Sequence, residues 1–157
     1  MLSPSHGYAL NLIYTSLNNK DIVWALTGST ALIVHGMQLP ANDIDIMTNE
    51  AGAYKIGELL KEFEIMPVSF SSTDKIRSHF GRYNIGGVSV EIMGDVQIKQ
   101  NDTWSDVDNL TLGIEHINYK NMMLPTLGLT REKLGYERLG RHERVREIMC
   151  HIVTLRR

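Results

Sequence analysis

The segment that decides the fold is Gly28–Ile46, which reads GSTALIVHGMQLPANDIDI. It follows the apolar run Ile22–Thr27, which is short enough to predict a buried strand. Gly28-Ser29 ends that strand, and Thr30–His35 is predicted to be a short helix closed by Gly36. The order is therefore a strand, a turn of small residues, a helix and a second, acidic strand.

The acidic strand carries two aspartates at strand spacing. In Asp43-Ile44-Asp45-Ile46, the two-residue period places both carboxylates on one face and both isoleucines on the other. The Cα atoms of Asp43 and Asp45 would lie ~6.6 Å apart, because a strand rises about 3.3 Å per residue. Two such carboxylates can converge on one hard cation or bridge a metal pair. An amphipathic strand with a solvated acidic face is the alternative interpretation.

The Gly28-Ser29 turn predicts a contact with an anion. Backbone N–H groups at the start of a helix attract negatively charged groups such as phosphate. Glycine lets the backbone approach a ligand closely, and the Ser29 hydroxyl can donate to a phosphate oxygen. A plain turn without a ligand is the alternative.

A third carboxylate lies on the strand predicted over Val88–Met93. Its apolar residues share one face, which leaves Ser89 and Glu91 on the other. A buried Glu91 needs a cation or solvent, because burying an unpaired charge is costly. A glutamate that faces water from an edge strand is the alternative.

The rest of the chain predicts a mixed α+β or α/β fold, with strands in the middle and helices at both ends. We expect helices over 5–19, 49–63, 130–139 and 141–155, and strands over 65–70, 82–85 and 88–93 joined by the turn Gly86-Gly87. Residues 71–79 are predicted to be a polar or helical stretch, and residues 106–119 a mixture of strand and loop. One domain is expected over 1–157, with a core at about 20–120 and a helical part at about 126–157.

The composition excludes several function classes. With 43% hydrophobic and 22% charged residues, the chain is typical of a globular protein, and a net charge of −2 argues against a basic nucleic-acid coat. The charge is uneven, at −6 over residues 1–127 and +4 over 128–157. A lone cysteine, Cys150, excludes an internal disulfide, and its apolar helix predicts that it is buried. No apolar run reaches the roughly 20 residues of a membrane span, and no signal peptide is recognised, so we expect a cytoplasmic protein without membrane contact.

Together these features resemble the nucleotidyltransferase superfamily, which has the DNA polymerase beta-like fold. The resemblance rests on Gly28-Ser29, the thirteen residues that follow, Asp43-Ile44-Asp45-Ile46 and the later strand with Glu91, over residues 22–93. Within that superfamily, the chain is similar to small stand-alone bacterial and archaeal members related to abortive-infection toxins and to aminoglycoside or lincosamide adenylyltransferases. The stretches 71–81 and 90–95 carry this closer similarity.

The resemblance implies a transfer of a nucleoside monophosphate from an NTP, ATP in the first place, to an acceptor, with release of pyrophosphate. Asp43, Asp45 and Glu91 would hold two magnesium ions, and Glu91 would also favour deprotonation of the acceptor. Gly28 and Ser29 would cradle the β and γ phosphates.

Basic residues are the further candidates for substrate contact. Lys133, Arg138 or Arg141 could neutralise triphosphate charge if the C-terminal helices cover the site, although a solvated helix face is the alternative for each. Arg77, His79 and Arg82 are candidate contacts to nucleotide or acceptor.

The resemblance is incomplete at the tail, where Glu143-Arg144 stands near the position of the superfamily's usual Lys-Asp pair. The acceptor stays open between a small molecule, a protein side chain and an RNA end, and a homo-oligomer could complete the site. Two alternatives to an active transferase are a catalytically silent nucleotide-binding module and a toxin or antitoxin component that binds a partner.

Overall fold

A mixed eight-stranded sheet organises the computed structural model, which describes residues 2–157. The strands lie in the order β3-β4-β5-β2-β1-β8-β7, and β6 pairs with β5 beyond this path. Two neighbouring pairs, β2 with β5 and β1 with β8, are parallel, and the others are antiparallel. The strands are β1 (Trp24–Thr27), β2 (Ile44–Thr48), β3 (Glu64–Ser72), β4 (Ile76–Ile85), β5 (Val88–Gln100), β6 (Thr103–Trp104), β7 (Ile114–Tyr119) and β8 (Met122–Leu127).

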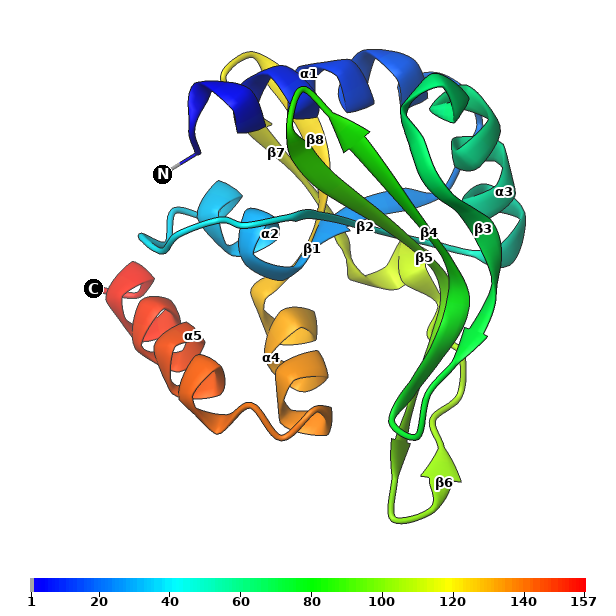
Figure 1. The fold of residues 1–157 in the computed structure, drawn as a ribbon. Helices are drawn as coiled ribbons and strands as arrows, with labels where there is room; N and C mark the ends of the chain where they lie inside the picture. Colours follow the sequence, from blue (N-terminus) through cyan, green and yellow to red (C-terminus); the bar gives the residue numbers. More distant parts are fainter. Residues whose placement is uncertain (1) are drawn as a thin grey trace.

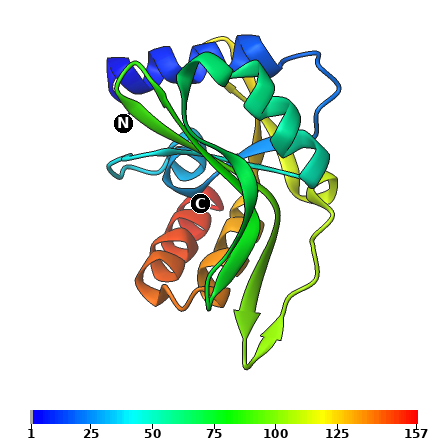
Figure 2. The same ribbon diagram turned by 45° about the vertical axis from the view of Figure 1, so that its right-hand side comes forward.

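Helices cover both faces of this sheet, which confirms the predicted α+β class. The helices are α1 (Pro4–Leu17), α2 (Gly28–Val34), α3 (Glu50–Leu59), α4 (Leu129–Arg138) and α5 (His142–Leu155), with short 3₁₀ turns at Lys61–Phe63 and Leu110–Gly113. Figures 1 and 2 show α1 and α3 on one side of the sheet and the pair α4 and α5 on the other. None of the described helices combines the length and apolar character needed to cross a bilayer.

The alternation of apolar residues decides which face of each central strand is buried. Ile44 and Ile46 of β2 and Val90 and Ile92 of β5 are fully buried in the main core, on the side that α1 and α3 cover. The residues between them, Asp45 and Glu91 among them, therefore point to the opposite face. The predicted strand around Asp43–Thr48 is confirmed, although β2 itself begins at Ile44.

One predicted element is wrong, and one strand was not predicted. Residues 71–79 form no helix, because β3 and β4 make a hairpin there, and Thr73 Oγ1 closes its turn by accepting from the backbone N–H of Ile76 at 3.0 Å. Residues 122–127 form the strand β8, which lies between β1 and β7. Four consecutive residues of β8, from Leu124 to Leu127, are buried, so the sequence lacks the alternation that marks a half-buried strand.

The C-terminal helices are confirmed, but the face that α5 buries is narrower than its apolar residues suggest. Val145 and Ile148 are buried, and Ile148 packs against Leu32 of the α2 segment. Met149 is about half exposed, and Cys150 is exposed, which corrects the prediction of a buried cysteine. Val153 and Leu155 are also exposed, so much of the apolar surface of α5 faces solvent.

Gly94 of β5 offers a test of how closely α3 packs on the sheet. A Cβ added there would lie 2.7 Å from the backbone oxygen of Asn49 and 2.8 Å from the Cβ of Ala53. We expect Gly94→Ala to lower the free energy of unfolding by about 1–3 kcal/mol, because overpacking forces the helix and the sheet apart.

The matched control for this substitution is Gly7→Ala. Gly7 lies in α1, and nothing would come within 4 Å of its added Cβ. It is expected to leave the stability unchanged or to raise it by up to about 1 kcal/mol, because alanine favours a helix over glycine. Denaturant unfolding measures both, and equal stabilities of the two variants would contradict the close packing of α3.

Candidate active site

The parallel pairing of β2 with β5 brings two carboxylates together. In the register of the two strands Asp45 lies directly opposite Glu91, on the face that α4 covers. Neighbouring strands lie about 4.8 Å apart, so both side chains can reach one ligand. Asp43 immediately precedes β2 and is half-buried, and its charge acts on Asp45. The structure therefore brings Asp45 and Glu91 together, and Asp43 lies near enough for its charge to act on Asp45.

Asp45 and Glu91, but not Asp43, line a cavity of about 230 Å³ between the sheet and the C-terminal helices. Its lining residues are Thr27, Gly28, Asp45, Ile76, Glu91, Met93, Glu132, Gly135, Tyr136, Leu139 and Arg141. A larger cavity of about 490 Å³ lies beside β7, but its one carboxylate, Glu115, is exposed. Paired, half-buried carboxylates make the smaller cavity the candidate active site.

Asp45 is the carboxylate that its surroundings disturb most. Burial, followed by the negative charges of Glu91 and Asp43, raises its pKa to about 7, and the nearby charge of Arg141 opposes this shift. A carboxylate with a raised pKa in a cleft is a common sign of a functional site. Three carboxylates, those of Asp45, Glu91 and Glu132, and one arginine, Arg141, line the cavity.

Two arginines lie near the carboxylates. Arg82 on β4 is paired with Glu91 in register, and its Nη2 lies 3.5 Å from Glu91 Oε1. Arg141, at the start of α5, lines the cavity from the opposite side. Both were predicted from the sequence as substrate contacts, and the structure brings both to the site.

Gly28 is required at the end of β1 for two reasons. Its φ of +69° lies in the left-handed region, which glycine adopts without strain. A Cβ at this position would also lie 2.6 Å from Asp45 Oδ2. The glycine predicted to approach a phosphate therefore also makes room for Asp45, and Ser29 follows it in the first turn of α2, half-buried.

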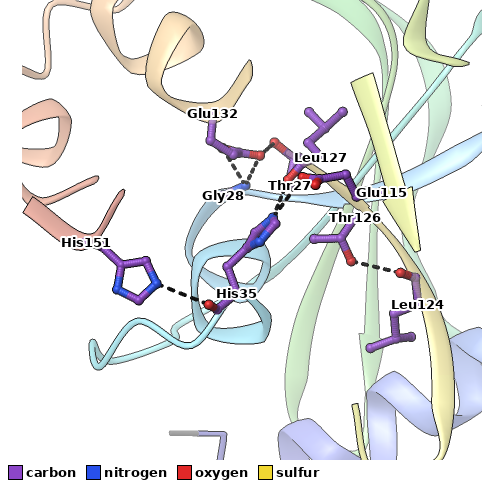
Figure 3. Close-up of polar contacts among 9 residues, drawn as sticks. All are labelled: Thr27, Gly28, His35, Glu115, Leu124, Thr126, Leu127, Glu132 and His151. Atoms are coloured by element: carbon purple, nitrogen blue, oxygen red, sulfur yellow. Dashed lines mark hydrogen bonds and ion pairs between the residues drawn. The ribbon is translucent and has the colours of Figure 1, made fainter. Parts of the chain in front are cut away.

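Glu132 of α4 is a site residue that the sequence did not single out. It is only 5% exposed, and Figure 3 shows its carboxylate pointing at the junction of β1 and α2. Its Oε1 accepts from the Thr27 hydroxyl at 2.5 Å and from the Gly28 N–H at 3.2 Å, and its Oε2 lies 3.3 Å from the same nitrogen. Burial raises the pKa of Glu132 to about 7, while these two hydrogen bonds oppose the shift.

A weak sequence signal for Glu132 exists. It stands in the first turn of a helix that follows Gly128, where acidic residues are common because they complement the helix dipole. The pattern does not distinguish it from any other glutamate at such a position. Only the return of the chain from β8 to the end of β1 shows that its partner is Gly28.

Three predicted contacts lie away from the cavity. Lys133 pairs with Glu137 along α4, at 2.8 Å. Arg77 donates to Gln97 at 3.0 Å and its guanidinium lies 4.3 Å from the centre of the Trp104 ring. His79 lies on the face of the sheet that α3 covers, 3.0 Å from the Tyr54 hydroxyl and 3.4 Å from Glu50. Direct substrate contacts by these three residues stay predictions.

The tail residues that replace the usual Lys-Asp pair also take ordinary roles on α5. Arg144 pairs with Glu147 at 2.8 Å, one turn away, and Glu143 is exposed. Arg138 pairs with Asp108 at 3.3 Å. Of the three C-terminal basic residues that the sequence suggested as triphosphate contacts, Arg141 is therefore the one that lines the cavity.

The donor set fits magnesium, which the superfamily resemblance implies. Magnesium prefers oxygen ligands, and it is commonly bound by one or two carboxylates together with substrate phosphates and water. Asp45 and Glu91 supply such a pair, and the raised pKa of Asp45 marks negative charge that a dication would offset. Within residues 2–157, no group of three or more histidine, cysteine or carboxylate side chains is arranged to hold a metal. Asp43, which directly precedes β2, and substrate phosphates would supply further ligands.

The chain is similar to known nucleotidyltransferases. The sequence profile of the family described as aminoglycoside-2''-adenylyltransferase matches residues 9–152. A candidate nucleotidyltransferase from Thermotoga maritima is 37% identical, with a TM-score of 0.86, over 98% of this chain and 96% of that one. No curated protein sequence matches the chain significantly.

Two more distant structures share the fold. One is ANT(2'')-Ia in complex with adenylyl-2''-tobramycin, at 9% identity and a TM-score of 0.59, over 92% of this chain and 87% of that one. The other is the lincosamide antibiotic adenylyltransferase LnuA bound to lincomycin, at 14% identity and a TM-score of 0.58, over 95% and 97%. At these identities the likeness concerns the fold.

The buried charge of Glu132 predicts a specific dependence of stability on pH. A carboxyl whose pKa rises from 4.5 in the unfolded chain to about 7 in the folded protein binds its proton more tightly when folded. The free energy of unfolding should therefore fall as the pH rises through this window, and this loss should be complete above it. Glu132→Gln keeps an acceptor oxygen without the charge, so it should be more stable than wild type at pH 8 by of the order of 2 kcal/mol.

The measurement is urea unfolding at pH 5 and pH 8 in buffer free of divalent cations. The advantage of Glu132→Gln should shrink at pH 5, where wild-type Glu132 is largely protonated, and Glu137→Gln on the exposed face of the same helix should follow wild type at both values. Parallel pH profiles of wild type and Glu132→Gln would show that Glu132 carries no buried charge.

Proposed function

The chain belongs to the aminoglycoside-2''-adenylyltransferase family of the nucleotidyltransferase superfamily, and on this basis we propose that it is a magnesium-dependent transferase that moves AMP from ATP to a hydroxyl acceptor. The observation that carries the proposal is the pairing of Asp45 with Glu91 on adjacent parallel strands, beside Gly28. Since the family profile covers 9–152, the helical part of the chain is included in the likeness.

In the reaction, the acceptor oxygen forms a bond to the α-phosphorus of ATP while the bond from that phosphorus to the bridging oxygen of pyrophosphate breaks. Magnesium, when bound, stabilises the negative charge of both the attacking and the leaving oxygens. Asp43, Asp45 and Glu91 would hold it. The acceptor loses its proton as it attacks, and the Glu91 carboxylate favours this loss.

The remaining residues act by position. Ser29, next to Gly28, would contact the β and γ phosphates, and Arg141 would neutralise triphosphate charge from the opposite side of the cavity. Arg82 holds the Glu91 carboxylate through their 3.5 Å contact. Tyr136, Met93 and Leu139 give the cavity an apolar wall on which a base or an acceptor ring can pack.

A small-molecule acceptor is favoured by the family and by the structural relatives. The family description names aminoglycosides, one relative was crystallised with adenylyl-2''-tobramycin, and another was bound to lincomycin. The cavity's excess of carboxylates would suit an acceptor with positive charge.

Binding of MgATP tests the metal assignment without knowledge of the acceptor. We expect calorimetry to show magnesium-dependent ATP binding by wild type, and Asp45→Asn and Glu91→Gln to weaken it about 100-fold or more, because each removes a ligand charge worth several kcal/mol. Asp74→Asn, in the exposed β3–β4 turn, is the matched control and should bind as wild type does. Equal affinity in Asp45→Asn and wild type would contradict the assignment.

Transfer itself is measured with ATP labelled at the α-phosphate, with tobramycin and lincomycin as probe acceptors. The expected result is labelled acceptor together with pyrophosphate, lost in Asp45→Asn. ATP binding without transfer to any hydroxyl compound in a wider panel would favour the catalytically silent module.

A further inference from the structure

The Gly28 N–H is already occupied in the folded protein. An amide nitrogen carries one hydrogen, and in Gly28 it points at the carboxylate of Glu132, with nitrogen-to-oxygen distances of 3.2 and 3.3 Å (Figure 3). Among the described residues, no lysine, arginine or histidine forms an ion pair with Glu132. The carboxylate is therefore committed to Thr27 and Gly28.

This contact reaches Asp45 through the backbone of Gly28. The peptide that Glu132 holds carries the φ of +69°, and Asp45 packs against the same glycine, where a Cβ would lie 2.6 Å from Asp45 Oδ2. A change in the Gly28 conformation would move the surface on which Asp45 rests. Gly28 therefore lies between Glu132, which its N–H contacts, and the Asp45 carboxylate.

Further contacts hold the start of α4, the helix that carries Glu132. Only Gly128 separates α4 from β8, and its N–H donates to the Gly113 oxygen at 3.0 Å. Arg131, next to Glu132, pairs with Asp108 at 3.0 Å.

A histidine holds the same junction from the side of α2. His35 Nε2 lies 2.8 Å from the backbone oxygen of Leu127, the last residue of β8 (Figure 3). His151 of α5 in turn contacts the His35 backbone oxygen at 3.2 Å. The α2 segment, which begins at Gly28, is therefore also bonded through His35 to β8, which leads into α4, and to α5.

From this geometry we propose that Glu132 is a positioning residue of the transfer reaction, which holds Gly28 and through it Asp45. The transfer reaction in this proposal rests on the proposed function. The choice of Glu132 rests on its contacts with Gly28. The opposite interpretation is that the Glu132 carboxylate blocks Gly28 and must leave before MgATP binds. The same variants distinguish the two interpretations.

The first test measures MgATP affinity by calorimetry, at a temperature at which every variant is folded by circular dichroism. Glu132→Ala should weaken binding about tenfold or more, because it frees the peptide on which Asp45 rests. Glu132→Gln keeps an acceptor oxygen and should restore an affinity close to wild type, and Glu137→Ala on the same helix is the matched control. An affinity of Glu132→Ala equal to or tighter than that of wild type would overturn the proposal, as would an equal loss in the Gln and Ala variants.

The rescue distinguishes positioning from a merely structural role. A residue that only stabilised the fold would lower the melting temperature of Glu132→Ala and leave its MgATP affinity unchanged at temperatures where it is folded.

The second test needs no nucleotide. Hydrogen exchange of the Gly28 amide, followed by NMR, should be slow in wild type and in Glu132→Gln and fast in Glu132→Ala. If wild type binds no MgATP, the proposed function fails. Loss of protection of the Gly28 amide in Glu132→Ala would still support the hydrogen bond between Glu132 and Gly28. Fast exchange of this amide in wild type would contradict that hydrogen bond whatever the protein binds.

Discussion

The parallel pairing of β2 with β5 is the constraint on which the rest of the site depends. It sets Asp45 opposite Glu91 and turns both toward the C-terminal helices, while the isoleucines and valines between them bury the other face. This pairing costs free energy, because burial and the neighbouring charges raise the pKa of Asp45 to about 7. A core on one face thus holds two mutually repelling carboxylates on the other, which is an arrangement that a bound cation would relieve.

The second constraint is the crowding around Gly28. One glycine ends β1, begins α2, makes room for Asp45 and donates its N–H to Glu132. Glycine is the one amino acid that adopts this φ without strain and leaves Asp45 the space that a Cβ would fill. This position therefore joins the sheet, the candidate metal ligands and the C-terminal helices. Residues 128–157 carry a net positive charge, and Arg141 is the residue through which it acts on Asp45. Lys133, Arg138 and Arg144 pair with carboxylates elsewhere.

The sequence predicts well those features that local patterns control. The alternation of Asp43-Ile44-Asp45-Ile46 and the apolar face around Glu91 locate the two central strands, and the Gly86-Gly87 turn locates the β4–β5 hairpin, with both glycines at positive φ. What it misses depends on distant contacts. β8 is buried along four consecutive residues and therefore shows no alternation, and Glu132 becomes a site residue only because β8 returns the chain to the end of β1. His79 was a candidate because of its residue type, but the register of β4 turns it toward α3.

The most direct test of this account is a crystal structure of the protein with Mn²⁺ and a non-hydrolysable ATP analogue, in which anomalous scattering locates the metal. The account predicts a metal peak within bonding distance of Asp45 and Glu91, the β and γ phosphates at Ser29, and Glu132 still bonded to Gly28. A nucleotide bound with its metal away from Asp45 and Glu91, or a phosphate in place of the Glu132 carboxylate at Gly28, would contradict it.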